Sequence, residues 1–216
     1  LAIPPENDCD VLANDIGLIA IVEAGKLAGF NVAVGGGMGL TYGNAATYPR
    51  LAELAGFVPA ERIVDACEAI AAIQRDHGCR TDRSHARFKY TLDDHGMAWF
   101  RERFADYHGT PMEAAREYRF IHNGDRFGWM EGENGTQHLP PMIQSGPLPA
   151  SARYPLRTAL REIAKVHHGE FRVTCNQNLM IANVTPVQQD RIQALVHEYG
   201  LDDGSRSTPL GRNAMS

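Results

Sequence analysis

Five glycines lie within thirteen positions of the stretch VAVGGGMGLTYGN, residues 32–44, directly after an apolar run. They are Gly35, Gly36, Gly37, Gly39 and Gly43. Glycine has no Cβ, so its backbone can approach a ligand closely, and successive N–H groups can form an anion-binding nest. The spacing matches neither GxGxxG nor GxxxxGK[ST], the usual nucleotide-binding motifs. Two interpretations stay open: a loop that grips an anionic cofactor, and a turn with an unusual backbone.

A basic cluster follows, with four permanent cations in ten residues and a histidine between them. Its members are Arg80, Arg83, His85, Arg87 and Lys89. Arginine grips carboxylates and phosphates with two parallel hydrogen bonds, so the cluster could bind a polyanion. The alternative is a solvated loop whose cations pair with Asp82, Asp93 and Asp94. Charge alone favours this alternative.

Polar side chains gather a third time in FRVTCNQNLMI, residues 171–181. Alternate residues of a strand share a face, so Arg172, Thr174 and Asn176 could face one ligand together. Asparagine is also common in hairpin turns, and we favour a turn here. His167 and His168 could bind a metal, but histidines near a helix end more often interact with the helix dipole.

Several elements must position these residues. Alternating apolar residues predict a hairpin of strands 16–23 and 27–34 that turns at Ala24-Gly25-Lys26, and the second strand is apolar on both faces, as in a central strand. A helix is predicted over 60–76 and ends at His77-Gly78 as at a C-terminal glycine cap. Its apolar stripe is Ile63, Ala66, Cys67, Ile70 and Ile73. A second helix over 97–109 would place Trp99, Phe100 and Phe104 on its apolar side.

The second half of the chain has a more regular pattern. Glu133-Asn134-Gly135 is a hairpin-turn signal, and helix 155–169 precedes two strands within 170–184. A last helix over 185–200 begins with Thr185 as N-cap, followed by proline and then by glutamine at the third helical position, which completes a capping box. The order strand, helix, strand, strand, helix predicts a ferredoxin-like half-unit. The fold class is therefore α+β: a mixed sheet with helices packed on it, then this half-unit.

Composition limits the class of protein. The 216 residues carry a net charge of −5, which argues against a general nucleic-acid binder. Four scattered cysteines without a CxxC pair indicate a reducing compartment and no metal site, and no run is long enough to span a bilayer. We therefore predict a cytoplasmic protein that binds neither nucleic acid nor membrane. A weak boundary separates domains 1–125 and 126–216.

Taken together, these stretches resemble the sirohaem- and [4Fe–4S]-dependent sulfite and nitrite reductases, and within them the sulfite reductase haemoproteins. The matching stretches occur in family order over nearly the whole chain. They are IPPENDCDVLANDIGLIAI, GKLAGFNVAVGGGMGLTYGNAATYPRLAELAGFVP, QRDHGCRTDRSHARFKYTLDD, NGDRFGWMEG, PLRTALREIAKVHHGEFRVTCNQNLMIANV and TPLGRNAMS. The resemblance implies an enzyme that passes six electrons singly from the cluster into sirohaem, reducing sulfite to sulfide or nitrite to ammonia. The electron donor would be a ferredoxin or a flavoprotein.

The resemblance also assigns residues to the cofactor. Sirohaem carries eight carboxylates, so its pocket needs cations and backbone donors. The loop at Gly35, Gly36 and Gly37 would approach the macrocycle. The positions that match basic residues on the sirohaem side are Arg83, Arg87 and Lys89, and those that match a QN turn at the cofactor face are Gln177 and Asn178.

The chain also departs from the family. The basic active-site strand of the family precedes the position of Leu1, and its cluster cysteines follow Ser216, so we expect an inactive internal fragment that binds neither cofactor and can self-associate. Tyr42 stands where the family often has histidine, and Arg87 where it often has lysine, which puts a proton-relay role for Arg87 in doubt because arginine does not deprotonate. The alternative function is a non-catalytic module that binds a nucleotide or another polyanion through the loop and the basic cluster.

Overall fold

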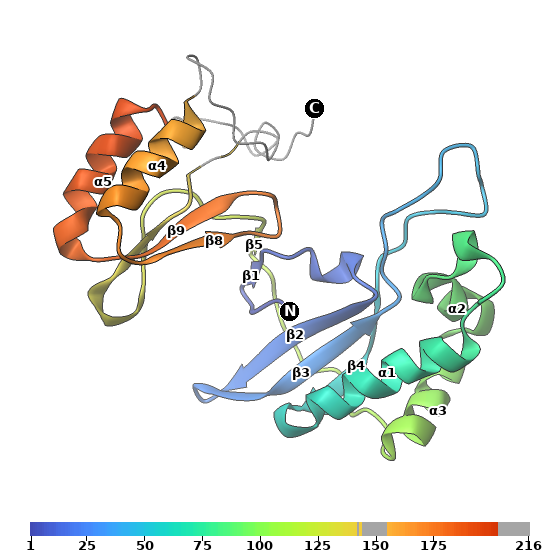
Figure 1. Cartoon of the computed structure of the whole chain (residues 1–216). Helices are drawn as coiled ribbons and strands as arrows, with labels where there is room; N and C mark the ends of the chain where they lie inside the picture. Colours follow the sequence, from blue (N-terminus) through green and yellow to red (C-terminus); the bar gives the residue numbers. More distant parts are fainter. Residues whose placement is uncertain (142, 144–154, 203–216) are drawn as a thin grey trace. The chain divides into compact units, whose positions relative to one another are not determined.

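The computed structural model describes residues 1–141, 143 and 155–202, and the chain divides into two compact units, Leu1–Gly124 and Asp125–Ser216 (Figure 1). The motif TPLGRNAMS lies outside the described residues. No helix in the described part of the chain combines the length and the apolar character needed to cross a membrane.

The first unit is built on an antiparallel sheet with strand order β2-β3-β4. Its strands are β2 (Ile16–Glu23), β3 (Lys26–Val34) and β4 (Glu53–Pro59). The predicted hairpin is confirmed: Ala24 and Gly25 both have positive φ, 50° and 75°, as a two-residue turn between twisted strands requires. Strand β4 was not predicted, because alanine and glycine in its sequence ELAGFVP are weak strand formers and its pairing partner β3 is distant in sequence.

Three helices cover one face of this sheet (Figure 1). They are α1 (Ile63–His77), α2 (Phe88–His95) and α3 (Met97–His108), and a 3₁₀ turn, Ala60–Arg62, leads into α1. The core joins Val32 and Val34 to Ile70 and Phe100, since β3 turns alternate side chains toward the helices. One detail was wrong: Gly78 has φ −74°, which is extended, so α1 does not end in a left-handed glycine cap.

The opposite face of the sheet is covered by the chain that follows α3. The buried Asn31 side chain donates to the Arg116 carbonyl (2.7 Å) and accepts from its N–H (2.9 Å). The Arg116 guanidinium also lies 3.6 Å from the centre of the Phe57 ring. Strands β1 (Glu6–Asn7) and β5 (His122–Asn123) pair in parallel and close this layer.

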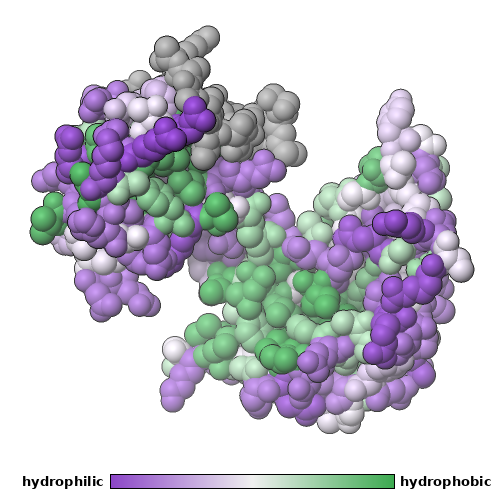
Figure 2. Space-filling model, in the orientation of Figure 1, coloured by the Kyte–Doolittle hydropathy of each residue, from purple (hydrophilic) through white to green (hydrophobic). Residues whose placement is uncertain are grey.

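Apolar side chains also reach the surface of the first unit. Figure 2 shows hydrophobic residues over the β2 and β3 side of this unit. Exposed large hydrophobic residues here include Leu1, Ile3, Val22 and Leu27, each at least 50% exposed. An exposed apolar patch can mark a protein contact, but self-association of the chain stays a prediction.

The second unit is a four-stranded antiparallel sheet of order β6-β7-β9-β8 with two helices packed on it (Figure 1). Its elements are β6 (Met130–Glu131), β7 (Gln137–Leu139), α4 (Leu156–Val166), β8 (Glu170–Val173), β9 (Leu179–Val184) and α5 (Pro186–Glu198). The predicted turn is confirmed by positive φ at Asn134 (56°) and Gly135 (74°). The capping box of α5, with Gln188 reaching back to Thr185, is confirmed too.

Candidate functional site

The amides of Gly35, Gly36 and Gly37 in the glycine loop donate hydrogen bonds to carbonyls of the chain itself. Gly35 N–H donates to the Asp15 carbonyl (2.9 Å), and Gly36 N–H to the Asn14 carbonyl (3.1 Å). Gly37 N–H donates to the Arg50 carbonyl (2.8 Å). The interpretation of these three amides as an anion-binding nest is therefore wrong for this structure, because none of them points at open space.

The glycines are needed for close packing against the protein itself. Gly35 has φ +79°, and a Cβ there would lie 2.3 Å from Leu92 Cδ1. A Cβ at Gly36 would lie 2.3 Å from the Leu12 carbonyl oxygen, and one at Gly37 would lie 2.8 Å from Arg87 Nη2. Contacts that short do not occur, so larger residues would displace the loop from the strand end and from its basic neighbours.

Lys89 holds the loop from inside. Its side chain is buried, 1% exposed, and Nζ donates to the carbonyls of Gly37 (3.0 Å) and Gly39 (2.8 Å) and also to that of Tyr48. The ammonium lies 4.9 Å from the centre of the Tyr90 ring. A buried cation without a carboxylate partner is tolerated only when oxygen acceptors replace its water, and three carbonyls do so here.

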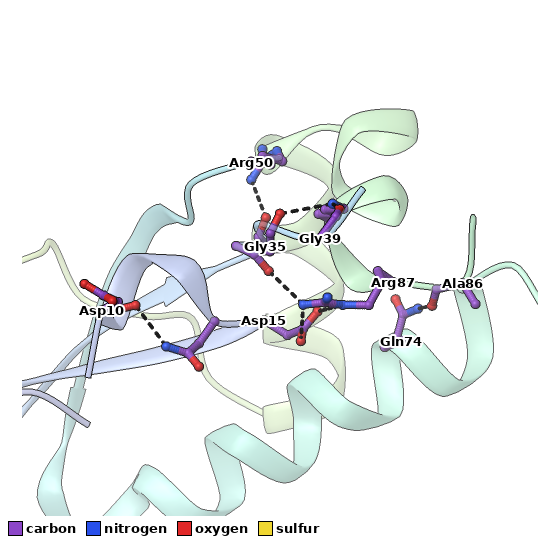
Figure 3. A network of polar contacts seen from close by, with 12 residues as sticks. Asp10, Asp15, Gly35, Gly39, Arg50, Gln74, Ala86 and Arg87 are labelled. Carbon is purple, nitrogen blue, oxygen red and sulfur yellow. Dashed lines mark hydrogen bonds and ion pairs between the residues drawn. The ribbon is translucent and has the colours of Figure 1, made fainter. Parts of the chain in front are cut away.

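Arg87 approaches the same loop from the solvent side (Figure 3). Its guanidinium forms a bidentate salt bridge with Asp15, in which Nε donates to Oδ1 at 3.0 Å and Nη2 donates to Oδ2 at 2.8 Å. Nη2 also lies 3.4 Å from the Gly36 carbonyl oxygen. Hydrogen bonding to Asp15 raises the pKa of Arg87 above its ordinary value. Both side chains are 45% exposed, so an anion from solvent can reach this pair.

The other two arginines of the basic cluster lie apart. Arg80 donates to the carbonyls of Gln74 and Arg75 and so covers the C-terminal end of α1, where a cation is favourable. Arg83 is exposed in a 3₁₀ turn, Arg83–His85, and makes no ion pair with any residue that the structure describes.

Among the described residues, the alternative in which nearby aspartates pair with the cluster holds for Asp94 and not for Asp82 or Asp93. Asp82 caps the 3₁₀ turn by accepting from the Ser84 hydroxyl (2.7 Å) and the Ser84 N–H (2.8 Å), and these two bonds, the hydroxyl bond first, lower the pKa of Asp82. Asp94 lies 3.4 Å from His85, while Asp93 binds an arginine outside the cluster. Asp82 precedes α2 and is used by the 3₁₀ turn. Asp93 shares a face of α2 with Lys89, but the Lys89 ammonium is bonded to backbone carbonyls.

That arginine is Arg50, which the sequence reasoning missed. Its side chain is 12% exposed and contacts Asp93 (Nε to Oδ1, 2.8 Å), the Gly35 carbonyl (Nη1, 3.0 Å) and the Glu53 carboxylate. Asp93 also accepts from the hydroxyl of Tyr48 at 2.7 Å, and this bond, helped by burial, raises the pKa of Tyr48 to about 12. A single arginine after a proline carries no local signal of such a role.

In the second unit the turn between β8 and β9 is organised by a carboxylate. Asp125 accepts from Thr174 Oγ1 (2.6 Å), Asn176 Nδ2 (3.1 Å) and Asn178 Nδ2 (2.7 Å). Asn178 Oδ1 also accepts from Ile143 N–H at 3.0 Å. The favoured turn is thus present, and the side chains of Thr174 and Asn176, which were considered as ligand-facing, are bonded to Asp125.

The neighbouring candidates have separate positions. Arg172 pairs with Glu170 at the surface (2.8 Å). Gln177 lies at the tip of the turn with φ 62°, a left-handed conformation. His167 is buried and contacts the Glu170 carbonyl (3.2 Å), whereas His168 is exposed. The described residues contain no group of three or more side chains arranged to hold a metal ion.

Comparison with known families decides the assignment. The family model of the nitrite and sulphite reductase 4Fe-4S domain matches residues 1–112, and the model of the nitrite/sulfite reductase ferredoxin-like half domain matches residues 132–199. The chain belongs to the nitrite and sulphite reductase family. The predicted family and the α+β fold class are thereby confirmed.

Individual relatives within the family cover the whole chain. It is 51% identical over 216 residues to a sulfite reductase [NADPH] hemoprotein beta-component of Anoxybacillus flavithermus, and 52% identical to that of Geobacillus thermodenitrificans. The match covers all of this chain but 38% of each relative. Among solved structures, the NirA protein of Mycobacterium tuberculosis matches with a TM-score of 0.77 and 26% identity over 96% of this chain and 36% of NirA.

Proposed function

We propose that this chain is part of an oxidoreductase that reduces sulfite to sulfide with six electrons, and that its first unit contributes a wall of the sirohaem pocket. The observation that carries the proposal is 51–52% identity, along the entire chain, to proteins named sulfite reductase hemoprotein beta-component. The name of the family model includes nitrite reductases, so nitrite, reduced to ammonia, is the second substrate to test.

The first unit fits a cofactor with many carboxylates through its side chains. Arg83 is exposed and makes no ion pair within the described residues, and Arg87 is 45% exposed beside a carboxylate that another anion can replace. The amides of Gly35, Gly36 and Gly37 do not add donors, since each is bonded to a chain carbonyl. The fit therefore rests on guanidinium groups, which bind carboxylates in two-bonded geometry.

Sirohaem, when bound, would supply the iron at which the substrate receives electrons. The residues of this chain would hold its periphery. We assign Arg83 and Arg87 to its carboxylates, and because arginine keeps its proton, Arg87 would supply charge and not protons. Lys89 would act through the loop, since its ammonium is bonded to three carbonyls. Gln177 and Asn178 are proposed as cofactor-side residues from the resemblance alone.

The remainder of the catalytic machinery belongs to the parent protein. Since the 216 residues cover 38% of each curated relative, we propose that the [4Fe–4S] ligands and the site for a ferredoxin or flavoprotein donor lie in its other segments. The isolated chain would then be inactive. The four cysteines of the chain, all of them in its described part, form no disulfide, which fits the reducing, cytoplasmic compartment that we propose.

The test is to purify the parent polypeptide and measure sirohaem absorption, iron content and reductant-dependent turnover of sulfite and of nitrite. We expect bound sirohaem and faster turnover of sulfite. A folded parent that is colourless and inactive toward both substrates would contradict the proposal. Titration of the 216-residue chain with ATP and NADPH tests the alternative that it binds a nucleotide or another polyanion. The hydrogen bonds that the glycine-loop amides donate to chain carbonyls argue against this alternative.

A further inference from the structure

Arg50 lies where the glycine loop closes on itself. Its N–H donates to the Gly37 carbonyl (3.0 Å), and its carbonyl accepts from Gly37 N–H (2.8 Å). This pair of backbone bonds joins the two ends of loop 38–49, most of which is exposed. The backbone alone fixes the base of the loop at one point, and a second constraint is needed to fix its orientation.

The Arg50 side chain supplies that constraint because it joins three separate elements, and Figure 3 shows its contact with Gly35. Nη1 donates to the Gly35 carbonyl at 3.0 Å, Nε donates to Asp93 on α2 at 2.8 Å, and Nη2 contacts Glu53 at the start of β4. A guanidinium has donors in a rigid planar fork, so these three contacts fix one another. The side chain is only 12% exposed, so water competes little for its donors.

Helix α2 holds the loop twice. Lys89 and Asp93 are four residues apart and so lie on one face of the helix. Lys89 binds the carbonyls of Gly37 and Gly39 directly, and Asp93 binds the loop through Arg50. The Gly36 carbonyl faces the other way, toward Arg87 Nη2 at 3.4 Å. The position of the loop relative to Arg87 thus depends on both attachments to α2.

We infer that Arg50, oriented by Asp93, is a positioning residue that fixes the glycine loop against α2 and thereby sets where Arg87 presents its charge. The inference rests on the proposed role of this face in holding sirohaem. Arg50 itself is directed inward to carbonyls and carboxylates, so it acts through the loop. A displacement of about 1 Å at a positioned group can reduce a rate about 100-fold, which sets the size of the expected effect.

The first test needs no cofactor. In the 216-residue chain, Arg50→Lys keeps the charge but cannot bridge three elements, so amide hydrogen exchange in residues 35–39 should rise at least tenfold while exchange in α3 stays unchanged. Asp93→Asn removes the carboxylate that orients Arg50 and should give the same pattern. Arg75→Lys is the matched control, because Arg75 is 68% exposed and, among the described residues, forms its ion pair with its neighbour Asp76, so exchange in residues 35–39 should not change.

The second test uses the parent enzyme loaded with sirohaem. Arg50→Lys should shift the sirohaem absorption bands and lower kcat for sulfite about 100-fold. The inference would be overturned if Arg50→Lys changed neither amide hydrogen exchange in residues 35–39 nor the sirohaem spectrum. It would also be overturned if exchange rose equally in residues 35–39 and in α3, because the substitution would then have destabilised the whole unit. Failure of the proposed function can be told apart from failure of this inference. If the proposed function fails, the wild-type parent carries no sirohaem, whereas the exchange experiment on the 216-residue chain does not depend on the cofactor.

Discussion

Replacing the buried Lys89 by methionine is expected to destabilise the first unit by about 2–4 kcal/mol. Methionine fills much of the same volume, so the main loss is of the three hydrogen bonds that Nζ donates. The Gly37 carbonyl keeps a donor, the N–H of Arg50 at 3.0 Å. The carbonyls of Gly39 and Tyr48 keep none within the described residues.

The magnitude follows from those two acceptors. An acceptor left unpaired in the interior costs about 1–3 kcal/mol, which gives about 2–6 kcal/mol for two. Both carbonyls are only partly buried, and removing a buried ammonium relieves its desolvation, so the lower half of that range applies. Against a typical unfolding free energy of about 5–15 kcal/mol, this loss is large.

The assay is urea unfolding of the 216-residue chain followed by the fluorescence of one tryptophan. The chain has two, Trp99 in the first unit and Trp129 in the second, so a Trp129→Phe background reports on the first unit alone. The control is Lys26→Met, which replaces an exposed lysine of the same unit and should change stability by less than about 0.5 kcal/mol. A Lys89→Met variant as stable as this control would refute the reasoning.

Three further predictions follow from the same geometry. Gly36→Ala should lower the urea midpoint of the first unit, because a Cβ there would lie 2.3 Å from a backbone carbonyl that cannot move aside; an unchanged midpoint would show that the loop shifts freely. Tyr48 should ionise near pH 12 in an ultraviolet titration, identified by difference from Tyr48→Phe, and Asp93→Asn should lower that pKa toward 10. Because the folded pKa of Tyr48 lies above its unfolded value, its contribution to stability is complete below about pH 10 and is lost as pH rises through 12. Cys79 should react with a thiol reagent faster than Cys67, since hydrogen bonds to its sulfur lower its pKa whereas burial raises that of Cys67; equal rates would contradict this order.

Local chemistry made much of the fold predictable. The Ala24-Gly25 turn, the Asn134-Gly135 turn and the capping box at Thr185 each depend on residues close together in the sequence, and the structure has all three. Strand β4 depends instead on its pairing with β3, which lies outside any local window. Alternation of apolar residues could not reveal it.

The sequence indicated which residues form the candidate site, but it did not indicate which partners they hydrogen-bond. The glycines, Arg87 and Lys89 do meet at one place in the first unit. Their partners are remote: Asp15 lies 72 positions from Arg87, and Asp93 lies 43 from Arg50. A side chain cannot be paired across such separations from one sequence. The alternative partners were therefore the aspartates nearest in sequence, and of these Asp94 contacts a cluster member, His85.

The absorption spectrum of the purified parent protein, compared with that of its Arg83→Ala variant, tests the central claim most directly. We predict that the wild-type parent carries sirohaem and that Arg83→Ala, with an unchanged circular dichroism spectrum, binds it about tenfold more weakly, because one charge-assisted contact is lost. A well-folded wild-type parent without sirohaem would contradict the assignment of function. Equal sirohaem affinity in the two proteins would contradict the place of this basic surface in the cofactor pocket.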